Sequence, residues 1–393
     1  MKKPAYIKVA SREWRLIVSS SSSRMLIFRI PLVVFLLLAG IYIAGALRKI
    51  PVAVLDQDHS DLSRTIITYL NASPETKVTA YLQSQGQLKD FFLNHPEKAV
   101  YFFPKGMEKK ILKGKDSGVK VMTNSANIIY GNVLKRNAYK LLETVSAGAL
   151  IKRLTAQGLT KAQAKQLALP IAVKSKPLFN TEYNYLYYLV PGLLTVLLQM
   201  IVFFLGARSI NKEFNAGKSQ QMLEVAEHKI INVIAGKILI YTLIGLILTL
   251  FTGIVFKLFG IPYHHRLGDT LLLFFFFSLA NAALGMMFSS LVPEEIVALD
   301  LALFYNSPAF IFSGFTFPIF GMPFWDSLWA KFIPYTYFLH AFFKLFEMGA
   351  PLKYASNEFL ALSAFAMTGI VTTYVTLKLK FKTEKPELIL KKA

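Results

Sequence analysis

Residues 185–207 read YLYYLVPGLLTVLLQMIVFFLGA and contain no charged side chain. The hydrocarbon core of a bilayer is ~30 Å thick, and a helix that rises ~1.5 Å per residue crosses it in about 20 apolar residues. Inside lipid, every backbone N–H and C=O group must find a partner within the chain, and a helix supplies those partners locally. This stretch therefore predicts a membrane-spanning helix.

Five further runs of the same kind lie along the chain. Hydrophobic residues make up 54% of the sequence and charged residues 17%, with a mean hydropathy of +0.44, whereas soluble domains carry about a quarter charged residues. We therefore predict an α-helical integral membrane protein with six transmembrane helices. The predicted spans are 25–47, 185–207, 230–256, 270–291, 296–317 and 356–377.

Basic residues flank the first and last predicted spans. The positive-inside rule therefore places both termini in the cytosol, and an even number of spans agrees with that. Anionic lipid head groups are sufficient partners for these charges, which disfavours nucleic acid as a partner. In residues 1–24, Ile7, Trp14 and Ile17 alternate with basic residues, which predicts a cytosolic amphipathic arm. The basic residues are Lys2, Lys3, Lys8, Arg12, Arg15 and Arg24 in the arm, and Lys378, Lys380, Lys382, Lys385, Lys391 and Lys392 in the predicted cytosolic tail, 378–393.

The first span resembles a signal peptide in one respect. Ala44-Gly45-Ala46 has the small residues of a cleavage site. The apolar run is longer than the roughly 7–15 residues of a signal core, and a polar arm precedes it. An uncleaved anchor is the favoured interpretation.

Residues 48–184 are mostly polar and long enough for one domain. Segments typical of strands (IPVAVLD, KVTAYL, KAVYFFP, GVKVMTN) alternate with helical ones, which predicts an inserted α/β domain. Because the N-terminus is predicted to be cytosolic, this domain is expected to be extracytoplasmic. Its helical stretch 128–168 forms either one helix or a hairpin broken at Gly148 or Gly158. Basic residues outnumber acidic ones, which indicates either a solvated surface or one for an anionic partner.

The remaining spans form a five-helix transmembrane domain, 185–377, with a predicted cytosolic segment at 208–229. Residues 318–351 are apolar but interrupted by prolines and glycines, which a straight span does not tolerate. This pattern predicts broken, re-entrant or interfacial helices on the outer face.

Two short motifs suggest enzymatic sites and fail on inspection. Gly217-Lys218-Ser219 matches the end of a phosphate-binding loop, but Lys212 stands where the first glycine is required and a membrane helix precedes it. His264 and Asp269 match an acyltransferase spacing, but they fall in a short loop with no phosphate-binding motif. The chain has no cysteine, and no catalytic or metal-ligand constellation is evident. We expect no catalytic residue, no metal and no enzymatic activity of its own.

Two predicted spans contain ionisable residues. Arg29 lies in the first span and Asp300 in the fifth. Charges inside a membrane are costly and mark functional sites, although snorkelling or an ion pair between these two residues is the simpler interpretation.

The order of these features resembles the ABC-2 type permeases of bacterial ABC exporters, in the subfamily with a large extracytoplasmic domain after the first span. Three stretches carry the resemblance: PVAVLDQDHSDLSRTIITYL with Asp58, Ser60 and Ser63, PLFNTEYNYLYYLVPGLL, and SGFTFPIFGMPFWDSLWAKFIPYTYFLHAF. By this resemblance the last stretch forms an outer gate, with Gly314, Pro318, Met322, Pro323 and Pro334.

The resemblance also gives segment 208–229 a role. In that family the corresponding segment reads roughly E-x-x-x-G-T-x-E-x-L-L and docks onto a separate ATPase subunit. The expected coupling residues are Glu213, Phe214, Gly217, Lys218, Met222, Leu223, Gly236 and Lys237. Lys218 and Gln220 depart from the pattern. A short helix that presents Phe214, Met222 and Leu223 would fit a groove on the partner; the alternative is a merely solvated turn.

The function implied is that of a permease subunit in the bacterial inner membrane. It would export an amphipathic or lipid-like substrate, in the manner of drug efflux. The chain would bind no cofactor, with ATP and Mg on the partner ATPase. A second copy or a paralogue would complete the permease, and an envelope adaptor is a further possible partner. The alternative is a receptor or envelope scaffold that acts through its outer domain.

Overall fold

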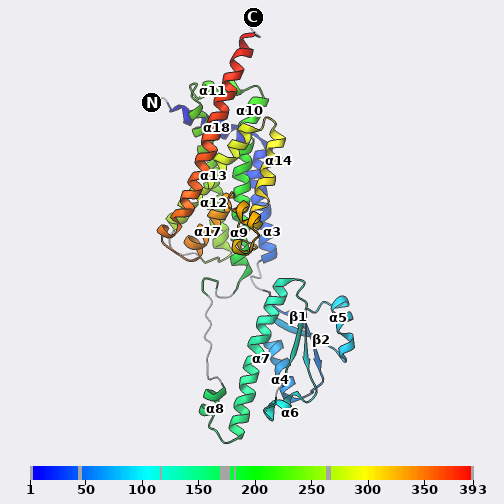
Figure 1. Ribbon diagram of the computed structural model, residues 1–393. Helices are drawn as coiled ribbons and strands as arrows, with labels where there is room; N and C mark the ends of the chain where they lie inside the picture. Colours follow the sequence, from blue (N-terminus) through cyan, green and yellow to red (C-terminus); the bar gives the residue numbers. More distant parts are fainter. Residues whose placement is uncertain are drawn as a thin grey trace. The chain divides into compact units, whose positions relative to one another are not determined.

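The computed structural model describes residues 3–42, 47–115, 117–168, 178–180, 183–262 and 267–390. Lys2, Ala44 to Ala46, His264, Lys391 and Lys392 lie outside the described residues. The chain divides into a helical unit, Met1–Gly45 with Pro177–Ala393, and a second unit, Ala46–Lys176 (Figure 1). Each unit is described by itself.

The helical unit contains six helical segments long and apolar enough to cross a membrane, among the residues that the structure describes. These segments are Ser21–Leu38, Tyr185–Asn215, Ile230–Leu258, Leu267–Leu291, Glu295–Phe312 and Leu352–Lys382. The fold is therefore a mostly helical one with six candidate membrane spans, as the sequence predicts.

The helices before the second unit are α1 (Ala5–Ser19), α2 (Ser21–Arg24), η1 (Met25–Arg29) and α3 (Ile30–Tyr42). Those after it are α9 (Tyr185–Ala207), α10 (Asn211–Asn215), α11 (Ser219–Val225), α12 (Ile230–Leu258), α13 (Leu267–Leu291), α14 (Glu295–Asn306), α15 (Ala309–Phe312), η3 (Ile319–Gly321), α16 (Phe324–Ala330), α17 (Pro334–Phe342), η4 (Phe343–Glu347), η5 (Leu352–Ala355) and α18 (Ser356–Leu390).

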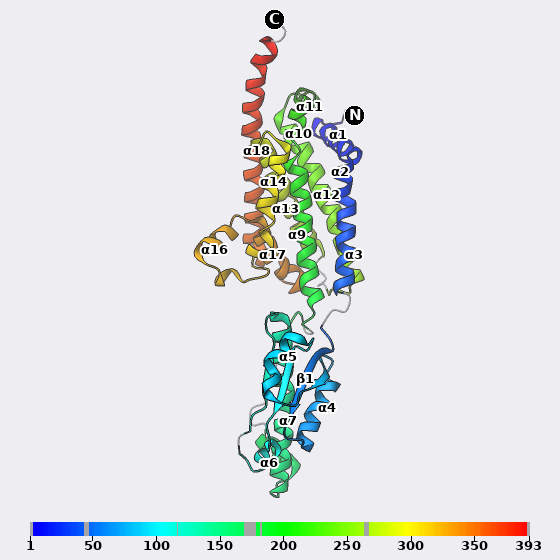
Figure 2. The ribbon, with the colours of Figure 1, turned by 90° about the vertical axis from the view of Figure 1, so that its right-hand side faces the viewer.

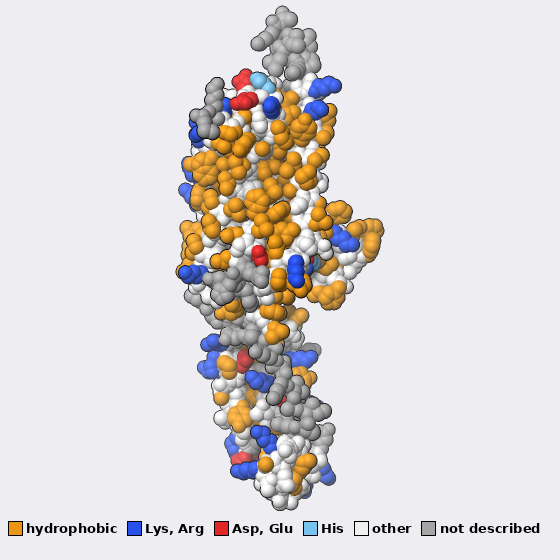
Figure 3. Space-filling model, turned by 90° about the vertical axis from the view of Figure 1, so that its left-hand side faces the viewer, with side chains coloured by type: hydrophobic (Ala, Val, Ile, Leu, Met, Phe, Trp, Pro, Cys, Tyr) orange, Lys and Arg blue, Asp and Glu red, His pale blue; other side chains and the backbone are white. Residues whose placement is uncertain are grey.

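Helix α13 is the centre of the helical unit and packs against α9, α12 and α18. Small residues allow the close approach that packing in lipid requires. A Cβ at Gly285 would lie 2.2 Å from the carbonyl oxygen of Phe203 on α9. Hydrophobic side chains cover much of the face of this unit that Figure 3 shows, as expected of a surface that faces lipid.

The fifth span is shorter than the expected 296–317. Helix α14 ends at Asn306, and α15 restarts after Pro308 and ends at Phe312. Beyond it, Gly314 adopts a left-handed conformation with φ +91°, and the next three prolines each lie at a helix start. Pro318 precedes η3, Pro323 precedes α16 and Pro334 is the first residue of α17. Proline suits these positions because it has no N–H to leave unpaired.

The second unit is built on a four-stranded sheet. Strands β1 (Ile50–Asp56), β2 (Thr76–Tyr81), β3 (Ala99–Phe103) and β4 (Lys120–Thr123) lie in the order β2-β1-β3-β4. Strand β1 pairs in parallel with β2 and β3, and β4 is antiparallel to β3. Every second residue of a strand faces one side, so Val52 and Val54 pack toward one cluster, and Ala53 and Leu55 toward another.

Helices cover both faces of this sheet. Helices α4 (Asp61–Ala72), α6 (Met107–Leu112) and α7 (Ile128–Ala156) pack on one face, and η2 (Gln85–Gln87) leads into α5 (Leu88–Asn94) on the other. The stretch after residue 128 is a hairpin. Helix α7 ends before Gly158, which has φ +96°, and α8 (Lys161–Ala168) follows. A left-handed glycine after the last turn is a common helix terminator, and Gly148 lies within α7 without breaking it.

Candidate functional site

The amphipathic arm forms helix α1, which lies against the beginning of α12. Gly236 makes this contact possible. A Cβ at position 236 would lie 2.6 Å from the backbone oxygen of Tyr6 and 2.6 Å from the Cβ of Val9. Residue 236 must therefore be a glycine for α1 to pack at this distance. Figure 2 shows α1, α10 and α11 together at one end of the helical unit.

Beside Gly236, Lys237 is fully buried. Its ammonium group lies 2.5 Å from Glu13 Oε2 on α1 and donates a hydrogen bond of 3.0 Å to the backbone oxygen of Ser209. The hydroxyl of Tyr241, one turn further along α12, donates to the other Glu13 oxygen at 2.5 Å. Each carboxylate oxygen of Glu13 therefore has a donor, which is the condition under which a buried charge is tolerated.

Glu213 of α10 completes the cluster. The Arg12 guanidinium donates two hydrogen bonds to its carboxylate, Nη1 to Oε1 and Nη2 to Oε2, the second at 2.9 Å. Lys237 Nζ lies 3.6 Å from Glu213 Oε1. Two cations and two carboxylates thus balance, and one carboxylate from α10 is bound by both α1 and α12. We call Arg12, Glu13, Glu213, Lys237 and Tyr241 the charge cluster.

Two further contacts fasten this region to the membrane helices. The Ser289 hydroxyl, at the end of α13, accepts the N–H groups of Ile210 and Asn211 at 2.8 and 3.0 Å. Arg208 pairs with Glu295 at the start of α14, 3.0 Å apart. A displacement of α10 would therefore reach α1, α12 and α13 through direct bonds, and α14 through Arg208, which lies just before α10.

The expected coupling residues divide into buried and exposed ones. Glu213 and Met222 are buried, with exposed fractions of 5% and 1%. Phe214 is half-buried against Phe381 of α18, with ring centroids 5.4 Å apart, and Leu223 is half-buried. The expectation that Met222 is presented to a partner is wrong, because the chain buries it in its own core.

The exposed part of the segment lies around the turn between α10 and α11. Gly217 has φ +65°, which allows the tight turn, and Lys218 is exposed beside it. Gln221 and Glu224 are exposed on α11. Gly217-Lys218-Ser219 therefore connects two short helices rather than a strand and a helix, which is not the context of a phosphate-binding loop.

The expected outer gate residues lie at the other end of α9. There Phe315 covers Gly192, and the hydroxyl of the buried Tyr335 donates to the Gly192 oxygen at 2.9 Å. Gly314, Pro318, Met322, Pro323 and Pro334 all belong to the segment from the end of α15 to the start of α17. The gate residues and the charge cluster are thus at opposite ends of one helix.

Arg29 and Asp300 do not pair with each other within the described chain. Arg29 is exposed on η1 and Asp300 is exposed on α14. Helix α9 contacts both α3 and α14, and Figure 2 shows it between them. Neither charge has an ion-pair partner among the residues that the structure describes.

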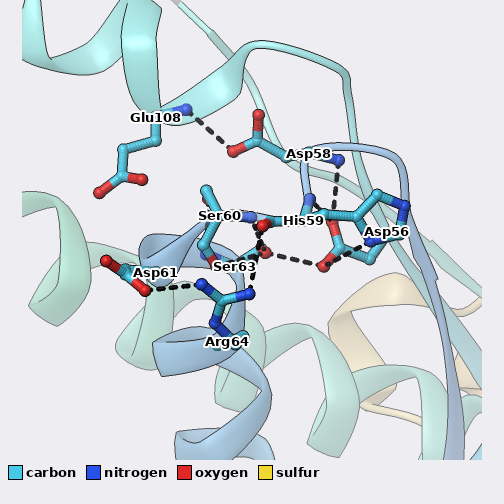
Figure 4. Close-up of polar contacts among 8 residues, drawn as sticks. All are labelled: Asp56, Asp58, His59, Ser60, Asp61, Ser63, Arg64 and Glu108. Atoms are coloured by element: carbon cyan, nitrogen blue, oxygen red, sulfur yellow. Dashed lines mark hydrogen bonds and ion pairs between the residues drawn. The ribbon is translucent and has the colours of Figure 1, made fainter.

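In the second unit, polar residues gather where β1 ends (Figure 4). Ser60 and Ser63 form a reciprocal capping box at the start of α4, and Ser63 donates to Asp56 at 2.7 Å. Asp58 accepts the Glu108 N–H at 3.0 Å. Burial acts to raise the pKa of Asp58, but hydrogen bonds from Ser60 and the backbone of residues 106–108 outweigh it and hold the pKa below its usual range.

Sequence reasoning missed the partners of the coupling segment. Glu13, Tyr241 and Ser289 have no motif of their own, and only the fold brings them to α10. An acidic residue on the apolar side of an otherwise basic arm was the one available signal for Glu13. Among the described residues no group of His, Asp or Glu side chains could hold a metal ion. His264 lies outside them, so the rejection of the His264–Asp269 motif rests on the sequence alone.

The fold and the site define a class: a multi-pass membrane protein whose spans are bonded to a short helical segment at one end. Residues 22–378 match the family model of the ABC-2 family transporter proteins, and the chain belongs to that family. It is similar to the probable multidrug ABC transporter permease YbhS of Escherichia coli K12 and to the protein of the same name from strain O157:H7. Each is 27% identical over 209 residues, which cover 51% of this chain and 54% of the relative. The chain thus matches about half the length of these relatives.

Proposed function

We propose that this chain is the permease subunit of an ATP-driven transporter of the bacterial inner membrane. Family membership supports a transport role, since the relatives are named as multidrug ABC permeases. The observation that carries the proposal is the charge cluster. It bonds α10 to α1 and α12, while Ser289 and Glu295 bond the same segment to α13 and α14, which is what a subunit driven by another protein requires.

ATP and Mg would be bound by the partner ATPase. Its surface would meet the turn at residues 215–218 together with Gln221 and Glu224, which are exposed. Glu213 would not touch the partner, because it is buried between Arg12 and Lys237. Its role would be to transmit a displacement of α10 to α1 and α12.

The permease would be a dimer, formed through the face of α3, α9 and α14. Arg29 of η1 and Asp300 of α14, both exposed and without an ion-pair partner in the described part of the chain, would lie at this face. Ser23 and Arg208 line one pocket, and Arg208 pairs with Glu295. Ser23 and Glu295 therefore lie at a similar height along the helix axes. Arg29 follows Ser23 by six residues and Asp300 follows Glu295 by five, so both lie about 7–9 Å from that level at ~1.5 Å per residue.

A two-fold axis parallel to the helices and beside α9 would bring α3 of one copy against α14 of the other. Arg29 would then pair with Asp300 of the second copy, twice per dimer. Each charge would then face its partner instead of lipid, which removes the cost of an isolated charge in the membrane. Self-association of one chain is thus favoured over a paralogue, because both members of the pair are present in this sequence.

The termini and the coupling segment would lie in the cytosol and the second unit outside it. Basic residues flank the first and last spans, in agreement with the positive-inside rule. An amphipathic substrate would leave past the segment with Gly314, Pro318, Met322, Pro323 and Pro334. An envelope adaptor on the second unit and bound lipids are further proposed partners.

The test is purification of the tagged chain from its own host in mild detergent. The expected result is a stoichiometric nucleotide-binding subunit that is lost when Lys218→Glu and Gln221→Glu reverse the exposed contact surface. Asp326→Asn, in the outer segment, is the matched control and should retain the subunit. Absence of any ATPase beside a folded permease would contradict the proposal and favour a receptor or scaffold.

A further inference from the structure

The sheet of the second unit has two edges, and they differ. At the β2 edge, the Val78 N–H donates to the side-chain oxygen of Asn71, at the end of α4, over 2.9 Å. Strand β4 forms the opposite edge, and no strand pairs with its outer side within the described chain. Strand β4 is therefore the open edge of this sheet.

The register of β4 decides which of its backbone groups face outward. The Asn124 N–H, just after β4, donates to the Lys98 oxygen at 2.8 Å. Along an antiparallel strand, alternate residues direct both backbone groups toward the partner strand. Met122 belongs to the same set as Asn124, so Val121 and Thr123 direct their N–H and C=O groups away from the sheet. These outward groups have no backbone partner in the part of the chain that the structure describes.

A groove lies along this edge, between β4 and α7. It has a volume of about 300 Å³, comparable to the smaller ligand sites of proteins. Val121 and Thr123 line one wall, and Tyr139 and Leu142 of α7 belong to the other. Val121 and Leu142 pack onto the core beneath, while Tyr139 is 68% exposed. The residues with outward backbone groups thus also border a largely apolar groove.

An open strand edge beside a groove recognises an extended chain. A segment added as a further strand would bond the outward backbone groups of β4, and its alternate side chains would enter the groove. A helix cannot do the same, because its own backbone groups are bonded within the helix. The occupant is therefore extended, with an apolar residue at every second position.

Charge distinguishes between the extended segments that could bind. Lys135 is the one charged residue in the groove lining, among the described residues, and Lys120 is exposed on β4 itself. Residues 46–176 contain 21 Lys and Arg against 9 Asp and Glu, so this unit attracts acidic segments and repels a second copy of itself. A lysine on an edge strand also disfavours pairing with the same strand of another copy.

We propose that the outer edge of β4 binds an extended segment of a partner protein in which apolar and acidic residues alternate. The apolar side chains lie in the groove. Met122 packs toward the other face of the sheet, and Lys120 shares that face because it is two residues away. The acidic side chains of the added strand therefore lie on the face of Lys120.

The inference rests on the proposed function for its meaning in transport, since it gives the binding chemistry of a partner on the second unit. The binding of an added strand itself stands on the open edge of β4 and on the groove.

Binding can be measured on the full chain in nanodiscs of neutral lipid, without an ATPase or nucleotide. The probe is a short fluorescent peptide of alternating valine and glutamate, and its fluorescence anisotropy reports binding. The charge-reversed probe has lysine in place of glutamate. We expect saturable binding of the glutamate peptide and no saturable binding of the lysine peptide.

Methylation of the peptide's amide nitrogens tests whether it binds as a strand. One peptide is methylated at its valines and the other at its glutamates. Only one of these two sets of N–H groups can face β4. We therefore expect one methylated peptide to bind like the parent peptide and the other to lose binding.

Thr123→Pro removes one outward N–H and keeps the ladder to β3, since proline is tolerated on an edge strand where its nitrogen faces solvent. We expect it to weaken peptide binding about fivefold, the effect of one lost hydrogen bond. Thr123→Ala keeps the N–H and is the matched control. Lys120→Glu should weaken binding severalfold, whereas Lys77→Glu, the same charge change on the β2 edge, should bind like the parent chain. Thermal unfolding of each variant shows whether it is folded.

Equal binding of the two methylated peptides would overturn the proposal, and so would equal peptide binding by the parent chain and a folded Thr123→Pro variant. A lower mass of the peptide-free Thr123→Pro variant in light scattering would assign the edge to a second copy and overturn it as well.

Failure of this inference is separable from failure of the proposed function. If the ATPase co-purifies but no peptide binds, only the assignment of the β4 edge is wrong. If the peptide binds but no ATPase is found, the permease assignment is wrong and the binding edge remains.

Discussion

At the scale of single residues, Lys237 has the most demanding environment in the helical unit. It is fully buried, and its charge is satisfied by Glu13, Glu213 and a backbone oxygen. A buried ion pair adds little net stability, because desolvation offsets the attraction, but removal of one partner leaves an uncompensated charge. Removal of both Lys237 and Glu13 should therefore destabilise the charge cluster less than removal of Lys237 alone.

We predict that Lys237→Met lowers the free energy of unfolding by about 3–5 kcal/mol, because it leaves two carboxylates facing one guanidinium. Addition of Glu13→Gln should restore part of that loss, since the charges then balance. Unfolding of the four chains of this double-mutant cycle, followed by heat in detergent, measures both effects. Purely additive destabilisation would contradict the described contact.

Asp58 gives a prediction that depends on pH. Its pKa is lowered in the folded chain, so its contribution to stability is present above the pKa of the unfolded state, about 4. That contribution is lost as the pH falls through the lower, folded-state value. Asp58→Asn should destabilise the second unit by about 1 kcal/mol at neutral pH and make it less sensitive to acid.

The full chain is incubated briefly at pH values between 7 and 3, returned to neutral pH and then digested with trypsin. The measurement is the extent of cleavage at each incubation pH. Asp61→Asn is the control, because Asp61 is exposed and its ion pair among the described residues is with Arg64 on the same helix. A parent chain and an Asp58→Asn variant with the same acid sensitivity would contradict the role given to this carboxylate.

At the scale of elements, the position of α1 depends on one glycine of α12. Gly236→Ala would place a methyl group 2.6 Å from the Tyr6 oxygen, and a helix backbone cannot yield without moving as a whole. We predict that the variant loosens α1 and that trypsin then cleaves after Arg12 and Arg15 severalfold faster.

Gly253→Ala on the same helix is the matched control, because a Cβ at position 253 meets nothing within 4 Å. It should leave the cleavage rate unchanged or slow it slightly, since alanine favours the helix by about 1 kcal/mol. Equal rates for both alanine variants would show that α1 does not depend on the close contact.

The sequence predicts elements here better than it predicts their partners. The six spans follow from apolar length, because lipid leaves a backbone few alternatives, and segments such as IPVAVLD and KAVYFFP correspond to β1 and β3. The break at Pro308 in the fifth span was missed, since proline can also lie within a span. Gly148 and Gly158 looked alike in sequence, and only Gly158 adopts a positive φ.

The coupling residues show more clearly what the sequence does not predict. The pattern around Gly217 locates the segment, but it does not tell whether a residue faces a partner or the chain itself. Glu213 is buried because Arg12 of α1 and Lys237 of α12 lie against it, and Met222 because α11 packs against α1 and α12. The contact between Arg12 and Glu213 joins residues 201 positions apart. Contacts of that kind come from the fold as a whole.

At the scale of the whole molecule, the proposed permease consists of two copies of the chain. We predict that Arg29→Asp and Asp300→Arg each weaken the dimer and that the double variant restores it, because the pair is then re-formed with reversed charges. The single variants place two like charges across the interface. The measurement is the mass of the purified permease in nanodiscs or detergent by light scattering.

Cross-linking supplies an independent check on that pairing. Because the chain has no cysteine of its own, a disulfide can form only between the introduced residues. Arg29→Cys in one tagged copy and Asp300→Cys in another should form a disulfide under mild oxidation. Two copies that each carry only Arg29→Cys should not. A double charge-reversal variant that remains monomeric would contradict the arrangement.

Transport as we propose it requires motion at the exposed segment to reach the far end of the helical unit through Glu213. The direct measurement is the emission of a fluorophore on Phe320→Cys, at a position that is 95% exposed in the outer segment, in the purified complex before and after addition of ATP. We predict a change in emission that is lost in Glu213→Gln while ATP hydrolysis continues. An unchanged response in Glu213→Gln would contradict it.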